Sequence, residues 1–95
     1  MENPEESAAS FSDFLLWMAT MIAVQFGDLP HPETGQPLEP NLPAARHFID
    51  IMGMLQEKTA GNLSPEEEKL IDDLLFELRR RFLDAQGSER RIITP

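Results

Sequence analysis

The stretch NLPAARHFIDIMGMLQEKTAGNLSPEEEKLIDDLLFELRRRFLDAQ, residues 41–86, decides the fold of this chain. Both of its halves repeat apolar residues every three or four positions, which is the spacing of one helix face. The second half begins with Ser64 and Glu67, the sequence pattern of a capping box. A connection of only three residues joins the halves, and short connections give antiparallel neighbours. The stretch predicts a helical hairpin, with helices over about 42–60 and 65–85.

A third helix is predicted upstream, over about 12–26, where Ser10 or Ser12 provides a cap. Apolar residues from Phe14 to Phe26 surround this helix on nearly every side, so they do not define a single stripe. A helix of that kind is buried on most sides. We therefore expect either the other two helices or a second protein surface to cover it.

The segment between the first two helices, residues 28–40, contains four prolines. Proline fixes φ and removes a backbone donor, so no helix is expected there. A turn is predicted at Glu33-Thr34-Gly35 because glycine accepts a positive φ. We expect a long, stiff and extended linker that runs back along the bundle or crosses to a second subunit.

The complete prediction is an all-α fold, a small three-helix bundle in a single domain over residues 10–86. Residues 1–9 are expected to be a disordered acidic N-terminus. Gly87 is expected to stop the last helix, which leaves residues 87–95 as a loose basic tail. Near the end of that helix, Arg79, Arg80 and Arg81 suit the negative end of the dipole. Glu77 is placed to pair with Arg81 four residues on.

Charge and cysteine content limit the classes of function. The formal net charge is -9, and residues 1–45 carry seven acids with no Lys or Arg, whereas 79–95 carry five arginines and two acids. Such a balance disfavours nucleic acid and anionic membrane surfaces, which bind through basic residues. It also lets the basic end of one chain meet an acidic surface of another. No cysteine is present, which excludes disulfides and thiolate chemistry.

Localisation is predicted from the same first helix. The apolar run from Phe14 to Phe26 is shorter than the roughly 20 residues of a membrane span. Acids rather than bases precede it, unlike the positive start of a signal peptide. We therefore expect a cytoplasmic protein that has no membrane partner.

The strongest functional indication is that the first helix carries more apolar surface than two neighbouring helices cover. Large exposed apolar patches mark interfaces, and Trp and Met suit them. We expect a homo-oligomer, most simply a dimer, with an interaction or regulatory role. The predicted interface residues are Phe14, Leu16, Trp17, Met18, Met21 and Val24.

No catalytic pattern is recognised, so no enzyme and no cofactor are predicted. The alternative hypothesis is a small metal- or ligand-binding protein that uses His31 and His47, although a metal site needs three or four converging ligands. A further alternative is an adaptor for an unidentified partner protein. The paired carboxylates around Asp72-Asp73 are interpreted as a solvated face of the last helix.

Several segments resemble a family of short bacterial proteins catalogued as domain of unknown function eighteen forty-four. The most distinctive is Glu57-Lys58-Thr59-Ala60-Gly61-Asn62-Leu63, and Pro32-Glu33-Thr34-Gly35-Gln36-Pro37 also fits. The resemblance covers roughly residues 10–83 and implies a bacterial source and a compact helical domain. It implies no activity, cofactor or catalytic residue.

Overall fold

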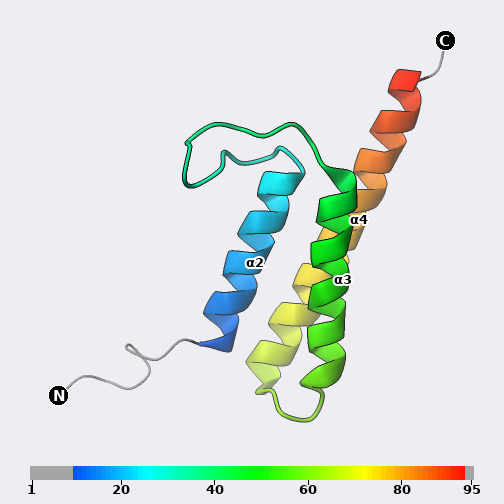
Figure 1. The fold of residues 1–95 in the computed structure, drawn as a ribbon. Helices are drawn as coiled ribbons and strands as arrows, with labels where there is room; N and C mark the ends of the chain where they lie inside the picture. The colour runs from blue at the N-terminus through cyan, green and yellow to red at the C-terminus, as the bar shows by residue number, and fades with distance from the viewer. Residues whose placement is uncertain (1–9, 94–95) are drawn as a thin grey trace.

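The computed structural model describes residues 10–93, with side chains placed for 10–87. It contains three helices, α2 (Phe11–Gln25), α3 (Leu42–Lys58) and α4 (Pro65–Ile93). Neighbouring helices along the chain run antiparallel, and each packs against the other two (Figure 1). Within the described residues the only β contact is a single bridge between Pro30 and Pro37. The predicted all-α three-helix fold is confirmed.

The helix starts follow the local sequence signals. The Ser10 hydroxyl accepts a 2.9 Å hydrogen bond from the Asp13 amide at the start of α2. The Asn41 side chain accepts a 3.1 Å hydrogen bond from the Ala44 amide at the start of α3. At α4, the Ser64 amide donates to the Glu67 carboxylate and the Glu67 amide donates to the Ser64 hydroxyl, at 2.8 and 3.2 Å. These caps satisfy backbone donors that have no partner inside a helix.

The core lies between the three inner helix faces. Ile22 of α2, Met52 of α3 and Leu75 of α4 are almost completely buried, and each belongs to one apolar cluster. The rest of this cluster is Leu15, Met18, Phe26, Ala45, Ile49 and Ile71. Burial of these side chains supplies the main driving force for folding in a chain that has no disulfide.

The segment that carries the family resemblance most distinctly, residues 57–63, forms the end of α3 and the turn that leads into α4. The Thr59 hydroxyl donates a 2.7 Å hydrogen bond to the Leu55 carbonyl in the last turn of α3. Gly61 has φ +85°, a left-handed conformation that favours glycine. Leu63 then packs against the core. These residues end one helix and direct the chain into the next.

The linker is more compact than the sequence predicted. The His31 amide donates a 2.9 Å hydrogen bond to the Gln36 carbonyl, so the chain turns back on itself. The predicted turn is present, with Gly35 at φ +70°. The Asn41 amide donates to the Gln25 carbonyl at 2.7 Å, which ties the linker's end to the end of α2 (Figure 1). Proline limits the local backbone but does not determine where the two ends of the segment meet.

The predicted end of the last helix is wrong. α4 continues through Gly87 to Ile93, so residues 87–93 are helical and do not form a loose tail. Gly87 is not among the glycines with positive φ and therefore does not terminate the helix. Strong helix formers on both sides, including Gln86 and Glu89, favour continuation despite a glycine cost of about 1 kcal/mol. The predicted N-terminal segment, residues 1–9, lies outside the described residues.

Candidate interaction surface

The outward side of α2 carries large apolar side chains. Phe14 is 43%, Leu16 49% and Trp17 58% exposed. The rings of Phe14 and Trp17 stack with centroids 6.2 Å apart, which fixes one aromatic surface across a helical turn. Trp17 lies between Phe14 and Leu16 around the helix, and the three residues together span about 160° of its circumference. We refer to this broad exposed side, Phe14, Leu16 and Trp17, as the α2 face.

Few charges interrupt the α2 face. Asp13 is the only charged residue of α2, and its amide is engaged in the helix cap. The neighbouring Thr20 directs its hydroxyl to the Leu16 carbonyl at 3.0 Å, inside its own helix. This arrangement leaves an apolar surface with few polar groups to desolvate on binding.

The structure divides the six predicted interface residues. Phe14, Leu16 and Trp17 are exposed, whereas Met18 and Val24 are 5% and 0% exposed and belong to the interior. Met21 is half-buried. Met18 faces the other helices as part of the core cluster. Val24 lies at the end of α2 where the linker returns, close to Gly27, whose backbone approaches the Leu38 carbonyl. Met18 and Val24 were predicted to belong to the interface, but they are buried within their own chain.

The two histidines do not form a common site with acidic residues. The Nδ1 atom of His31 accepts a 3.1 Å hydrogen bond from the Glu33 amide within the linker. His47 is exposed on α3, with its ring 6.3 Å from that of Phe48. In the part of the chain that the structure describes, no group of three or more His, Asp or Glu side chains could hold a metal ion.

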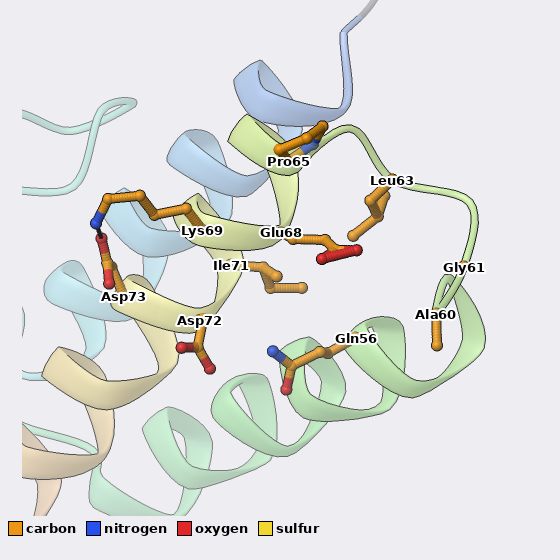
Figure 2. A pocket seen from close by; sticks show the side chains of 10 residues that line it. All are labelled: Gln56, Ala60, Gly61, Leu63, Pro65, Glu68, Lys69, Ile71, Asp72 and Asp73. Carbon is orange, nitrogen blue, oxygen red and sulfur yellow. Dashed lines mark hydrogen bonds and ion pairs between the residues drawn. The ribbon is translucent and has the colours of Figure 1, made fainter.

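An open groove of about 660 Å³ lies where α3 ends and α4 begins (Figure 2). Its polar rim includes Gln56, Glu68, Lys69 and Asp72. The Lys69 ammonium donates a 2.7 Å hydrogen bond to Asp73, and this bond raises the pKa of Lys69. The cation of the groove is therefore engaged within its own helix, and the carboxylates beside it are exposed.

A bidentate ion pair joins the linker to α4. The Arg81 guanidinium donates to both Asp28 oxygens at 2.7 and 2.9 Å, and it lies 4.8 Å from the centre of the Phe26 ring. The hydrogen bonds from Arg81 lower the pKa of the Asp28 carboxyl, while partial burial opposes this shift. The sequence predicted Glu77 as the partner of Arg81, and that prediction is wrong. A partner 53 residues away cannot be inferred from helical spacing.

The outward side of α4 was not predicted as an apolar surface. Phe76 and Leu83 are each 65% exposed, more than any other large apolar side chain in the described part of the chain. With Asp72, Asp73, Arg79 and Arg80 they line a shallow groove of about 590 Å³, and we refer to these six residues as the α4 face. A signal was present, because Phe76 and Leu83 are seven residues apart and lie off the buried stripe of α4.

The fold and its surfaces define a small all-α domain whose exposed features are apolar helix faces. None of the helices in the described residues has the length and apolar content needed to cross a membrane. The chain belongs to the family described as Domain of unknown function (DUF1844), which it matches over residues 8–84. Neither a curated protein nor a solved structure matches it.

Proposed function

We propose that this protein is a non-catalytic interaction module that associates with copies of itself through the α2 face. The observation that carries the proposal is the exposure of Phe14, Leu16 and Trp17 on one helix that has a single charged residue. Trp is enriched among the few residues that supply most of the energy at protein interfaces, and the stacked Phe14 ring and Leu16 add apolar area beside it. The proposal places the protein in the cytoplasm of a bacterium, in line with its family resemblance and its lack of cysteine.

Electrostatics also favours a contact that is mainly apolar. The chain carries a net charge of -9, and like charges oppose close approach of two copies. Within α2 itself Asp13 is the only charged residue, so this helix adds little to that repulsion. Burial of apolar area stabilises the contact by about 25 cal/mol per Å² before the costs of association.

The test is the concentration dependence of the mass in solution, measured by sedimentation equilibrium on the wild-type chain and on two α2-face variants, Leu16→Glu and Trp17→Glu. Both side chains are about half exposed, so the substitutions should leave the helical signal and the melting temperature nearly unchanged. We expect the dissociation constant to rise at least about tenfold, the effect of roughly 1.4 kcal/mol.

A matched control is Met54→Glu on α3. Met54 is 44% exposed, a fraction similar to those of Phe14 and Leu16, but it lies on a different helix. This variant should associate like the wild type. If Leu16→Glu and Trp17→Glu both keep the wild-type association constant, the α2 face is not a self-association surface.

A further inference from the structure

The α4 face has a charge order that the α2 face lacks. Two acids, Asp72 and Asp73, lie one turn before Phe76, and two arginines, Arg79 and Arg80, lie one turn after it. All four charged residues are exposed and line the same groove as the phenylalanine. Along a helix, residues three and four positions away share a face, so the six side chains form one stripe.

This order is symmetric about Phe76. Asp72 and Arg80 are each four residues from it, and Asp73 and Arg79 are each three residues from it. Two such helices placed antiparallel around a two-fold axis at Phe76 bring the acids of one copy opposite the arginines of the other. A two-fold interface uses the same patch on both subunits and must be self-complementary in this sense.

We propose that the α4 face is an interface between two copies of this chain, which pair antiparallel about Phe76. In this register the two Phe76 rings meet at the axis, and the acids of each copy face the arginines of the other. Asp72 lies on the same flank of the contact as Arg79 of the second copy, and Asp73 lies on the same flank as its Arg80. Lys69 lies opposite Leu83 of the second copy, where its aliphatic stem covers apolar surface while its ammonium stays in water. The proposal concerns a surface separate from the α2 face and does not depend on it.

Charge favours this register over a second antiparallel register, in which the apolar residues Phe76 and Leu83 meet. An antiparallel pairing that matches Phe76 with Leu83 of the second copy is centred between Arg79 and Arg80. It places those arginines against the arginines of the partner, and like charges directly opposed are unfavourable. The register about Phe76 avoids this repulsion, because it places both acids of each copy against the two arginines of the other.

The charges of the α4 face are largely free to bind another chain. Among the ion pairs of the described residues, none involves Asp72, Arg79 or Arg80, whereas Asp73 is paired with Lys69 of its own helix. The Arg79 guanidinium lies close over Gly53 of α3, so this side chain leans toward α3, whereas Arg80 is exposed. Asp72 and Arg80 are therefore the two charged residues of the α4 face with the least competition inside the monomer.

The contact is small. The stripe from residue 69 to 83 is about 21 Å long at 1.5 Å per residue. Two stripes of this length bury less than the roughly 800 Å² per partner of a standard interface. We therefore expect weak, salt-sensitive dimers that form at high micromolar concentration.

The test uses full-length chains that also carry Trp17→Glu, so that the α2 face does not contribute. Sedimentation equilibrium is measured on this background, on D72R/D73R, on R79E/R80E and on the quadruple variant D72R/D73R/R79E/R80E. Each double variant gives the stripe charges of one sign, so its self-association should weaken at least about tenfold. The quadruple variant exchanges acids and bases, restores complementarity and should associate like the background.

An equimolar mixture of the two double variants provides a second measurement. The all-basic and all-acidic stripes are complementary, so the mixture should form heterodimers although the self-association of each variant is weakened. Circular dichroism checks that each chain is folded. If the quadruple variant has a lowered melting temperature, the mixture of the two double variants serves as the test of charge complementarity. The proposal is overturned if the Trp17→Glu background is monomeric up to about millimolar concentration, if the double variants associate like the background, or if the mixture fails to associate. Failure of the α2 proposal has a different signature, because Trp17→Glu alone would then match the wild type.

Discussion

The α2 face and the α4 face both expose large apolar side chains but differ in their charges. Phe14, Leu16 and Trp17 stand beside one acid, whereas Phe76 and Leu83 stand among two acids and two arginines. An apolar contact gains energy from removing water and gives little information about orientation. A patterned contact gains less from area but specifies one register and direction. The two faces therefore suit strength and specificity, respectively, and each can be tested separately.

The largest expected effect separates the two sides of α2. Met18 is 5% exposed and Leu16 is 49% exposed, although both are apolar residues of the same helix. Met18→Ala leaves a cavity in the core and should lower the free energy of unfolding by about 2–4 kcal/mol. Leu16→Ala removes an exposed side chain and should change it by no more than about 0.5 kcal/mol. Urea unfolding followed by circular dichroism, at concentrations where the chain is monomeric, measures both.

Equal losses for the two variants would contradict the division of α2 into an inner and an outer side. Val24→Ala provides a second check, because Val24 is fully buried near the end of α2. It should be costly like Met18→Ala, although the sequence alone placed Val24 in the interface.

The intermediate effect separates the two faces by their response to salt. From 0.1 to 1 M sodium chloride the screening length falls from about 10 to about 3 Å. The Trp17→Glu chain retains only the α4 contact, and its dissociation constant should rise about tenfold. The R79E/R80E chain retains only the α2 contact, and its constant should stay the same or fall slightly. Sedimentation equilibrium at both salt concentrations measures the two constants.

The same salt response in both chains would mean that charge does not distinguish the two faces. A chain that carries all three substitutions is the matched control. It should remain monomeric at both salt concentrations, because neither contact is left.

The sequence predicted those parts of the fold that depend on local signals. The caps at Ser64 and Asn41 and the turn at Gly61 act over a few residues, and all three are present in the structure. The end of α4 was missed because a glycine stops a helix only when its φ becomes positive, and the sequence does not report that angle. The linker path was missed because proline sets local geometry, whereas the closing bond from Asn41 to Gln25 is made between distant residues.

The candidate surfaces were predicted unevenly for a related reason. α2 is apolar on nearly all sides, so its sequence offers no contrast from which to separate Met18 inside from Trp17 outside. α4 has a clear buried stripe, and this contrast would have identified Phe76 and Leu83 as outward residues. The charges around them were interpreted as a solvated face, as compensation for the helix dipole and, for the arginines, as part of a basic end that could meet an acidic surface of another chain.

The smallest expected effect separates the arginines of α4 from one another. Arg81 binds Asp28 of its own chain, while Arg80 faces outward on the α4 face. Asp28→Asn should lower the free energy of unfolding at pH 7 by about 0.5–1 kcal/mol, since this ion pair is partly exposed and screened by solvent. Glu39→Gln, at an exposed acid of the same linker, should have almost no effect.

The pH dependence of the unfolding free energy shows whether the loss in Asp28→Asn comes from the ion pair with Arg81. Hydrogen bonds from Arg81 lower the pKa of Asp28 in the folded state, so the folded chain releases this proton more readily than the unfolded one. The stabilisation is therefore complete above the unfolded pKa of about 3.9 and disappears as the pH falls through the lower folded value. The difference in unfolding free energy between wild type and Asp28→Asn should be constant from pH 7 to about pH 5 and shrink below about pH 4. A difference that stayed constant down to pH 2 would assign the effect of Asp28 to packing at the linker. Arg81 would then contribute no more than Arg80 to the stability of the monomer.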